Sequence, residues 1–443
     1  MARLQDKRNA RHALRNLTPA RQHLTAAVDL GASKVGCFIV KPDGIRRDQR
    51  TLSVAGVGYV QSKGVKGGAI VNMEEAAHAV AQAVERAEAM AGVSVSGVQV
   101  SWAGGQLASK RVSAQVPLGP RPVSDNDLSR AIHACLQQAR FAGRRPIHLL
   151  PIAWSVDGAR GVKDPRAMIG RALGLELCIV TISESAFRTL GHCLELAHLN
   201  FEGVVAAPFA SALSALEDDE LELGALCIDM GGGSTSAAVF SGGSLVHVDS
   251  LAVGGGHVTA DIARALSTSL AGAERIKTLH GSCIASANED REMVEAPPRG
   301  DDVGAGPTVV PRSMLKGVIQ PRVEETLELL RDRLKANGPA IDAGVGVVLT
   351  GGASQLTGVR ETAVKIFDRP VRLGRPKRVP HLADAAAGPA FCAAAGVLQR
   401  SAFGPREAVS ARALAGQRNA QRDAADASGG MVTRSLLWLR ENL

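Results

Sequence analysis

The chain of 443 residues contains 51 Lys and Arg against 43 Asp and Glu, which gives a formal charge of +8, and 45% of its residues are hydrophobic. Residues 1–24 carry an excess of five positive charges and residues 400–443 an excess of three, so the 375 residues between them hold equal numbers of basic and acidic side chains. A nucleic-acid-binding domain with a basic groove is therefore excluded as the main interpretation, and no nucleic acid is expected as a partner.

The length and composition are typical of a soluble chain with about three domains and sizeable hydrophobic cores. The seven cysteines are odd in number and scattered, without a CxxC pair, which argues against a disulfide framework and a zinc site and favours a reducing cytoplasm. No run of 18 apolar residues is present, and the basic start is not followed by the apolar segment of a signal peptide. We therefore expect a cytoplasmic protein without a membrane span.

A basic arm and a β-hairpin are the first predicted features. Residues 1–23 are polar, basic and without periodicity, and we expect them to be disordered. The elements predicted next, in chain order, are a strand over 24–30, a tight turn over 31–34, a strand over 35–40, a helix over 73–91 with Asn72 as its N-cap, and a strand over 95–102.

A short pattern recurs two hundred residues further along the chain. Ala27-Val-Asp-Leu-Gly-Ala-Ser-Lys34 is matched by Cys227-Ile-Asp-Met-Gly-Gly-Gly-Ser-Thr235. In both copies an apolar strand ends in an Asp, directly before a turn of Gly and small hydroxyl residues that leads into a second apolar strand. The chain is therefore predicted to contain a duplicated α/β unit.

Two further Gly-rich elements and a linker follow. Val253-Gly-Gly-Gly256 precedes a helical pattern over 257–270. Thr350-Gly-Gly-Ala-Ser-Gln-Leu-Thr-Gly358 lies between an apolar strand over 344–349 and a helix over 359–367. Residues 404–430 lose their apolar content and have the composition of a linker.

The Gly-rich turns have the chemistry of a polyphosphate site. Glycine turns let backbone N–H groups approach phosphate closely, and the start of a helix favours anions. Asp29 and Asp229 would repel a phosphate, so their natural role is to orient water molecules on Mg²⁺. Glu274 and Lys277 share a helix face and are candidates for binding ribose hydroxyls. The predicted nucleotide-binding residues are Asp29, Gly31, Ala32, Ser33, Lys34, Asp229, Gly231, Gly232, Gly233, Ser234, Thr235, Gly254, Gly255, Gly256, Glu274, Lys277, Gly351, Gly352 and Ser354.

One Asp-x-Gly turn is more often an ordinary hairpin than a phosphate loop. Here two such turns, a GGG helix start, an E-x-x-K helix and a strand-GG-helix occur in one order, and this combination resembles the actin, Hsp70 and hexokinase superfamily of two-lobed ATP-binding proteins. The phosphate loops would be 29–34 and 229–235, and the adenosine motif 349–358. Ile147-His-Leu-Leu-Pro151 through Met168, together with the segment 313–330, narrows the resemblance to FtsA, the family of bacterial cell-division actin homologues.

The resemblance implies an α/β, two-lobed actin-like ATPase fold with duplicated RNase H-like cores, an inserted subdomain in the first lobe and a C-terminal amphipathic helix. Connecting helices are expected at 208–216 and 386–398, where small residues suit close helix crossing. The expected divisions are the arm 1–23, subdomain 1A at 24–105 and 181–224, the inserted subdomain 1C at 106–180, subdomain 2A at 225–275 and 341–385, subdomain 2B at 276–340, the return helix 386–403, the linker 404–430 and the membrane-targeting helix 431–443.

The same resemblance implies a cell-division function. A protein of this kind would bind ATP and Mg²⁺, polymerise, anchor the ring of tubulin-like FtsZ to the cytoplasmic face of the inner membrane at the division site, and recruit later division proteins through its inserted subdomain. The C-terminal peptide of FtsZ would dock on subdomain 2B, with Lys316 and Arg322 as candidate contacts. ATP-hydrolysing members of the superfamily place Gln or Glu in the first connecting segment, but residues 205–211 contain neither. We therefore expect slow turnover at most and assign no catalytic residue.

The last thirteen residues have an amphipathic pattern. A helix of this length measures about 20 Å, short of the roughly 30 Å hydrocarbon core, so it can lie in the membrane interface but cannot cross the membrane. A helix docked on the protein's own core or on a partner is the alternative, but the 27-residue linker and the family resemblance favour the membrane. The predicted membrane-binding residues are the apolar Met431, Val432, Leu436, Trp438, Leu439 and Leu443, with Arg434 and Arg440 attracted to anionic lipids.

Two alternatives come from the same superfamily. A small-molecule kinase would need a second substrate pocket with an acidic base, for which no motif stands out. A pilus-assembly-type actin homologue shares the phosphate loops and a related insertion, but that family normally engages the cytoplasmic peptide of a membrane protein. The terminal amphipathic helix argues against it.

Overall fold

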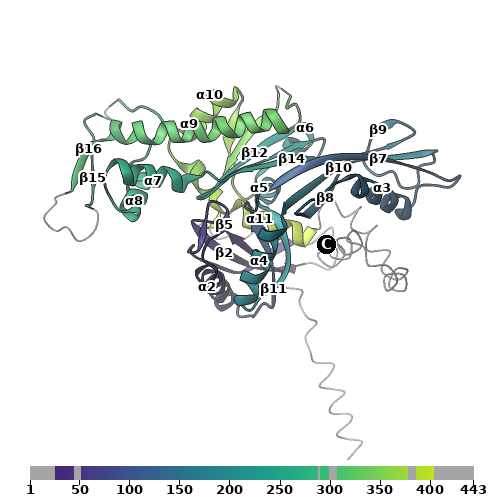
Figure 1. Ribbon diagram of the computed structural model, residues 1–443, viewed down its shortest axis with the longest axis horizontal. Coiled ribbons are helices and arrows are strands. Elements are labelled where there is room, and N and C mark those ends of the chain that lie inside the picture. The colour runs from purple at the N-terminus through teal and green to yellow at the C-terminus, as the bar shows by residue number, and fades with distance from the viewer. Residues whose placement is uncertain are drawn as a thin grey trace, which may run out of the picture.

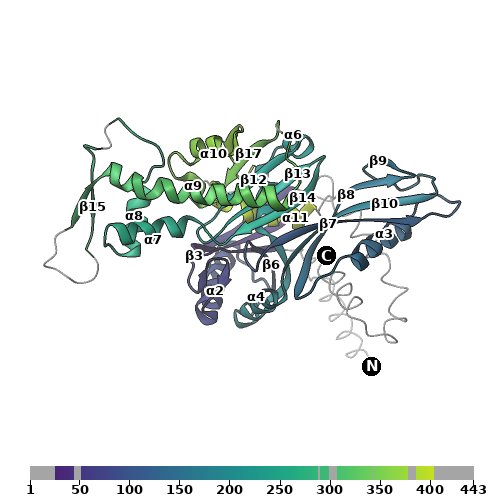
Figure 2. The same cartoon turned by 45° about the horizontal axis from the view of Figure 1, so that its top comes forward.

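The computed structural model describes residues 25–43, 51–287, 290–298, 307–342, 344–377 and 386–403. Two α/β lobes pack against each other, and an extension projects from each end of the molecule (Figures 1 and 2). One extension contains β7–β10 and α3, called the inserted subdomain below, and the other contains β15, β16 and the start of α9. The predicted arm 1–23, linker 404–430 and membrane helix 431–443 lie outside the described residues.

The first lobe is built on a five-stranded sheet in the order β11-β6-β1-β2-β3. Its strands are β1 (Thr25–Leu30), β2 (Lys34–Asp43), β3 (Thr51–Gln61), β6 (Gly97–Trp102) and β11 (Asn200–Ala206). β1 and β2 are antiparallel, with Asp29 opposite Gly36, which confirms the predicted hairpin. The predicted helix 73–91 is α2 (Met73–Ala91), and its N-cap Asn72 accepts a hydrogen bond from the N–H of Glu75 at 3.2 Å.

The second lobe repeats this arrangement. β12 (Ala225–Met230) and β13 (Thr235–Ser241) form an antiparallel hairpin with Asp229 opposite Ser236, and β17 (Gly346–Thr350) runs parallel to β12 as β6 does to β1. β14 (Ser244–Leu251) and β18 (Val371–Leu373) extend the sheet on either side. The predicted duplicated α/β unit is thereby confirmed.

The inserted subdomain continues the sheet of the second lobe. Its strands are β7 (Ala108–Pro117), β8 (Arg144–Val156), β9 (Ala159–Val162) and β10 (Ala172–Ser183), covered by α3 (Asp125–Gln138). β7 pairs with β14 at Ala108 and Asp249, so nine strands form one sheet in the order β18-β17-β12-β13-β14-β7-β10-β8-β9. By chain position the insertion belongs to the first lobe, and the sequence did not predict this pairing.

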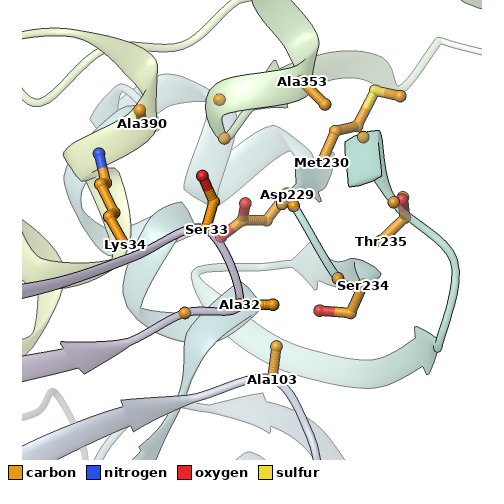
Figure 3. A pocket seen from close by; sticks show the side chains of 18 of the residues that line it. Ala32, Ser33, Lys34, Ala103, Asp229, Met230, Ser234, Thr235, Ala353 and Ala390 are labelled. Atoms are coloured by element: carbon orange, nitrogen blue, oxygen red, sulfur yellow. The ribbon is translucent and has the colours of Figure 1, made fainter. Parts of the chain in front are cut away.

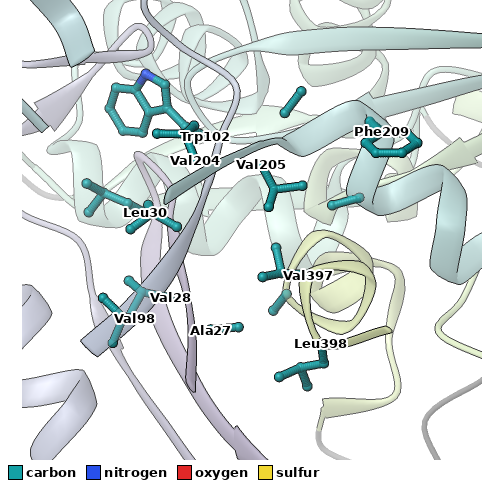
Figure 4. Close-up of a cluster of buried hydrophobic side chains, with 14 of the residues drawn as sticks. Ala27, Val28, Leu30, Val98, Trp102, Val204, Val205, Phe209, Val397 and Leu398 are labelled. Carbon is teal, nitrogen blue, oxygen red and sulfur yellow. The ribbon is translucent and has the colours of Figure 1, made fainter. Parts of the chain in front are cut away.

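Two helices connect the lobes and cross closely. They are α5 (Ala207–Ala215) and α11 (Cys392–Phe403), and β1, β6, β11 and α11 contribute to the buried cluster in Figure 4. The predicted helix 386–398 was wrong at its start: Pro389–Phe391 form a short 3-10 turn, η3, and the α-helix begins at Cys392. The physical reason is that proline disfavours the helical conformation in the residue before it, and Gly388 is extended, with φ −77° and ψ 162°.

The helix crossing predicts a stability effect at Gly396. A Cβ atom at this position would lie 1.7 Å from the carbonyl oxygen of Ala210 on α5. We expect Gly396→Ala to lower the free energy of unfolding by about 1–3 kcal/mol, because the two helix backbones must separate. Gly317→Ala is the matched control, since it also lies within a helix but its Cβ would meet no atom within 4 Å; it should stabilise by about 0.5–1 kcal/mol. Denaturant unfolding followed by circular dichroism measures both, and equal effects would contradict the close crossing.

The remaining described elements complete the two lobes and the extension at β15 and β16. The helices are α4 (Glu184–Leu196), α6 (Asp218–Leu223), α7 (Gly255–Ala265), α8 (Leu270–His280), α9 (Arg312–Asn337) and α10 (Val359–Phe367), with the 3-10 turn η1 (Gly352–Gln355); the short strands are β4 (Val65–Lys66), β5 (Ala69–Ile70), β15 (Met293–Ala296) and β16 (Thr308–Pro311). The predicted helix 257–270 is two helices, because Ser267 has φ +49° and Ser269 caps α8. Within the described residues, no helix is both long and apolar enough to cross a membrane.

Candidate functional site

A cavity of about 470 Å³ lies between the lobes. Its size falls within the range of small-molecule binding sites. Both predicted phosphate loops, the start of α7, the α8 residues Glu274 and Lys277, and the turn after β17 line it. Of the nineteen predicted nucleotide-binding residues, all but Gly256 and Ser354 are among its lining residues.

The two Asp-Gly turns face each other across the cavity. A Cβ atom at Gly232 would lie 2.8 Å from the Cβ of Ser33, and one at Gly233 would lie 2.6 Å from the Cβ of Ala32. Figure 3 shows Ser33 of the first turn next to Asp229 of the second. The structure thus brings together, at the tips of two hairpins, the segments that the sequence repeat had paired.

Asp29 and Asp229 end β1 and β12 and lie deep in the cleft. Burial raises the pKa of Asp29, while the nearby Lys34 opposes the shift. Burial also raises the pKa of Asp229, to about 6, against a hydrogen bond of 2.6 Å that its Oδ2 accepts from the hydroxyl of Ser211; the charge of Asp29 raises it further. Two buried carboxylates that destabilise each other's charged form are suited to a cation between them.

This pair fits a magnesium ion held through water. No cluster of three or more His, Cys, Asp or Glu side chains that could hold a metal occurs in the described ranges. Asp29 and Asp229 alone could not complete the six oxygen ligands of Mg²⁺, which usually keeps several waters and takes further oxygens from substrate phosphates. The donor set therefore fits a metal that arrives with a polyphosphate.

Lys34 adopts a position that its place in the phosphate loop did not predict. Its Nζ lies 3.2 Å from the centre of the Phe391 ring, a cation–π contact with the segment that precedes α11. Figure 3 shows the side chain directed toward Ala390 of the same segment. Burial lowers the pKa of Lys34, with the charges of Asp29 and Asp229 opposing this.

The first N–H groups of α7 differ in part from the prediction that they bind phosphate. The N–H groups of Gly255 and Gly256 donate to the carbonyls of Gly231 and Gly232, at 2.9 and 2.7 Å. These two donors brace the second phosphate loop. They are therefore not directed at a ligand, and Gly256 does not line the cavity. The nearby Glu274 and Lys277 do line it, as an ion pair of 2.7 Å whose Lys277 Nζ also donates to the carbonyl of Gly255.

The turn after β17 closes against the second phosphate loop. Gly351 has φ +85°, and a Cβ atom there would lie 2.4 Å from Oδ1 of Asp229, so only glycine fits at this contact. Gly352 lines the cavity beside it. Ser354 is buried, and its hydroxyl donates to the carbonyl of Gly351 at 2.7 Å, so its role is to hold the turn.

Several residues of the site were not predicted from the sequence. Ser211 lies on the buried face of α5 and orients Asp229; a polar residue within an Ala-rich connecting helix was the available signal. The cavity is also lined by Val323 and Thr326 of α9, by Gln355 at the end of η1 and by Leu356 directly after it. Gln355 and Leu356 lie within the predicted Gly-rich motif 350–358 but were not named as nucleotide-binding residues, whereas the α9 residues reach the cleft only through tertiary packing.

The two candidate partner contacts both lie on α9. Lys316 is partly exposed near its start. Arg322 pairs with Asp261 of α7 at 2.6 Å and with Glu325 at 2.5 Å, so it also ties α9 to α7. The predicted membrane-binding residues, Met431 to Leu443, lie outside the described part of the chain.

Solved structures of low sequence identity share this architecture. The PilM-PilN type IV pilus biogenesis complex aligns with a TM-score of 0.60 and 17% identity over 87% of this chain and 100% of that one. MreB5 of Spiroplasma citri bound to AMPPNP aligns with a TM-score of 0.52 and 16% identity over 86% and 96%. Two lobes with facing Asp-Gly hairpins and crossing helices between them define an actin-like protein.

Sequence comparisons are more specific. A family model described as cell division protein FtsA matches residues 226–396, and one described as the SHS2 domain inserted in FtsA matches residues 104–181. FtsA of Rhizobium meliloti is 42% identical over 391 residues, 87% of this chain and 88% of that protein, and FtsA of Escherichia coli is 29% identical over 94% and 98%. The chain belongs to the FtsA family of cell division proteins. The kinase and pilus-assembly alternatives are not favoured.

Proposed function

We propose that this cell division protein binds ATP with Mg²⁺ in the cleft between its lobes. The observation that carries this proposal is the pair of Asp-Gly turns in contact across a cavity of about 470 Å³. MreB5 of Spiroplasma citri, which shares the fold, has been solved with AMPPNP and with ADP. Asp29 and Asp229 hold the metal through water, and Ser33, Lys34, Ser234 and Thr235 contact the phosphates.

The affinity for Mg²⁺ and nucleotide should depend on pH. The metal requires ionised carboxylates, and Asp229 has a pKa of about 6 in the free protein. Affinity should therefore be constant above about pH 7 and fall up to about tenfold per unit as the pH drops below about 6. Calorimetric titration across pH 5–8 measures this. The terminal phosphate of ATP also titrates near pH 6, so Asp229→Asn is the control: it should bind weakly and show a shallower slope, and equal slopes would contradict the assignment.

The nucleotide acts mainly as a ligand that controls conformation and polymerisation. Ala207 is the residue of the first connecting segment that lines the cleft, and it has no side chain that could orient a water molecule. Phosphoryl transfer to water depends on such positioning. Turnover is accordingly slow in this proposal.

The C-terminal peptide of FtsZ docks on subdomain 2B, at the hairpin β15–β16 and the start of α9. Met293, Val309 and Met314 expose large apolar side chains there, and the partly exposed Lys316 lies close to Met314 in the chain. This combination suits a peptide with apolar and acidic residues. Lys316→Glu is the cleaner test of this surface, since replacing Arg322 would also break its ion pair with Asp261.

The chain acts as a tether when its last residues bind the membrane. Residues 431–443 lie in the interface on the cytoplasmic face of the inner membrane, the linker 404–430 gives them reach, and the inserted subdomain contacts neighbouring subunits and later division proteins. The divisions expected from the sequence, from 24 to 403, are kept in this proposal. Filaments present many such helices at once, which raises the total affinity.

Co-sedimentation tests the whole proposal. The full chain is mixed with vesicles containing anionic lipid and with a labelled peptide of the FtsZ C-terminus, with and without Mg²⁺ and ATP. We expect the protein to carry the peptide to the vesicle pellet, Lys316→Glu to pellet without it, and nucleotide to increase the pelleted fraction. A peptide that stays in the supernatant with the wild-type protein would rule out the tether.

A further inference from the structure

Phe391 belongs to the short turn η3, which precedes α11 at the junction of the two lobes. Its ring packs on the first lobe: the ring centre lies 6.0 Å from that of Phe38 on β2 and 6.0 Å from that of Tyr59 on β3, both in edge-to-face contact. Pro389 and Ala390, the other residues of η3, line the nucleotide cleft, whereas Phe391 does not. The ring is therefore directed at the first lobe rather than into the cleft.

The alternation of side chains along β2 forms the surroundings of this ring. Lys34, Gly36 and Phe38 lie on one face of the strand, and Tyr59 of β3 is paired with Gly36, so its side chain lies on the same face. Gly36, which has no side chain, separates Lys34 from Phe38 on this face. The Phe391 ring is thus set among one cation and two aromatic rings.

The second lobe holds the other end of η3. The carbonyl of Pro389 accepts hydrogen bonds from the hydroxyl of Thr350 at 3.0 Å and from the N–H of Gly351 at 3.1 Å. Together with the two aromatic contacts, these bonds fix the position of the Phe391 ring. Replacing Lys34 should therefore leave the ring in place.

The ammonium group of Lys34 rests on the face of the ring. Its Nζ lies 3.2 Å from the ring centre. Among the described residues it forms no ion pair with Asp29 or Asp229, although the charges of both act on it. Figure 3 shows Lys34 reaching toward the segment of Ala390, while Asp229 lies beside Ser33. In the nucleotide-free protein the ring, rather than a carboxylate, is thus in contact with this charge.

We propose that Phe391 is a positioning residue of the nucleotide site, because its ring competes with the phosphates for the ammonium group of Lys34. The inference rests on the proposed function, in which Lys34 contacts the phosphates. The ring holds the ammonium group while no nucleotide is bound, and the ammonium group leaves the ring when a phosphate arrives. Since this contact is lost on binding, the ring lowers the affinity for nucleotide and favours its release.

Removing the ring should therefore strengthen nucleotide binding. Cation–π contacts that are partly withdrawn from water favour the paired state by about three- to tenfold. Phe391→Leu keeps an apolar side chain next to Phe38 but removes the ring face, so ATP with Mg²⁺ should bind about three- to tenfold more tightly. Phe391→Tyr keeps the face and should bind as the wild type does. Calorimetric titration above about pH 7, where Asp229 is ionised, measures these affinities.

A double-mutant cycle separates this role from a structural one. In the Lys34→Met background, Phe391→Leu should leave the affinity for ATP with Mg²⁺ unchanged, because no ammonium group remains for the ring to hold. Phe187→Leu is the matched control. It also removes a ring that lies under a cation, since the guanidinium of Arg145 is 4.8 Å from its centre, but that cation does not line the cleft. This control should bind ATP as the wild type does.

The NMR signal of the Lys34 side chain reports the ring contact directly. Protons that lie over the face of an aromatic ring are shielded by its ring current. The signal of the Lys34 ε-methylene group, assigned with Lys34→Met, should therefore lie upfield of its usual position in the nucleotide-free protein. It should return to the usual position on saturation with ATP and Mg²⁺, and Phe391→Leu should abolish the upfield shift without nucleotide.

The nucleotide function and the competition fail in different ways. A wild-type protein that binds no ATP would overturn the nucleotide function and the competition with it, even if the upfield signal is present. If ATP binds, the competition is overturned by a Lys34 signal at its usual position in the free protein or by an upfield signal that persists at saturation. It is equally overturned if Phe391→Leu binds ATP no more tightly than the wild type, or if the same gain appears in the Lys34→Met background.

Discussion

Asp229→Ala is expected to weaken the binding of ATP with Mg²⁺ by about 100-fold, because groups that orient the ligands of a bound metal contribute about 10–100-fold to its affinity. Asp229 lies at the tip of the second hairpin, next to the first turn, and faces Asp29 in the cleft. Without it, one carboxylate is left to orient the waters of the metal. The Gly turns remain, so weak binding through backbone donors should persist.

The same variant should make the nucleotide-free protein more stable. Burial raises the pKa of Asp229 from 3.8 to about 6, which corresponds to about 3 kcal/mol of destabilisation at neutral pH. Because the pKa is raised, the folded state keeps its full stability at low pH, where Asp229 is protonated, and loses this amount as the pH rises through about 6. The alanine removes that cost and leaves the hydroxyl of Ser211 without its acceptor, a loss of about 1 kcal/mol. The net gain is about 2 kcal/mol above pH 7, as in other sites where function opposes stability.

Two measurements on one preparation check both effects. Thermal unfolding with and without Mg²⁺ and ATP should show a higher midpoint for the variant alone and a smaller increase on adding nucleotide. Asp219→Ala, on the exposed surface of α6, is the control and should behave as the wild type does. If Asp229→Ala lowers the midpoint of the free protein and keeps the full nucleotide shift, the assignment of the cleft is wrong.

Removal of residues 431–443 is expected to release the protein from anionic vesicles almost completely. The predicted helix buries Leu436, Trp438 and Leu439 at the level of the lipid headgroups, and each nearby cation contributes about 1 kcal/mol. Arg434→Gln and Arg440→Gln should each weaken binding about fivefold. The loss should be largest where filaments form, because every subunit then contributes one helix to the same surface.

Vesicle sedimentation at several fractions of anionic lipid measures the truncation. The truncated chain keeps all described residues, so its melting temperature and nucleotide binding should match those of the full chain. Neutral vesicles are the control for the contribution that Arg434 and Arg440 make to the binding of anionic lipid. A truncated chain that sediments with anionic vesicles as the full chain does would move membrane binding to another part of the molecule, of which the basic arm 1–23 is the first candidate.

Local patterns made much of the fold predictable. The helix 73–91 was predicted at its observed bounds because Asn72 caps a regular apolar periodicity, and the hairpins at Asp29 and Asp229 followed from apolar strands on either side of Gly turns. The pairing of β7 with β14 could not be predicted, because Ala108 and Asp249 are distant in the chain and nothing local specifies which strands meet.

Within the candidate site, the residue types were easier to predict than the directions in which their donor groups and side chains point. Gly255 and Gly256 lie where expected, yet their N–H groups donate to the second phosphate loop. Lys34 contacts the ring of Phe391, and its position depends on a segment more than 350 residues further along the chain. Ser211 acquires its role only when α5 packs against β12. These features arise from tertiary contacts that motif spacing does not encode.

The nine-stranded sheet has a mechanical consequence. The hydroxyl of Ser109, on β7, donates to the carbonyl of Val248 and accepts from its N–H at 2.7 Å, which strengthens the junction with β14. A pull on the inserted subdomain by a neighbouring subunit would travel through β14 into β13, the strand that leaves the Asp229 turn. The load would reach the Asp229 turn without passing through the connecting helices. Under the proposed function, tension between subunits would therefore act on the cleft through two neighbouring strand pairs, β7–β14 and β14–β13.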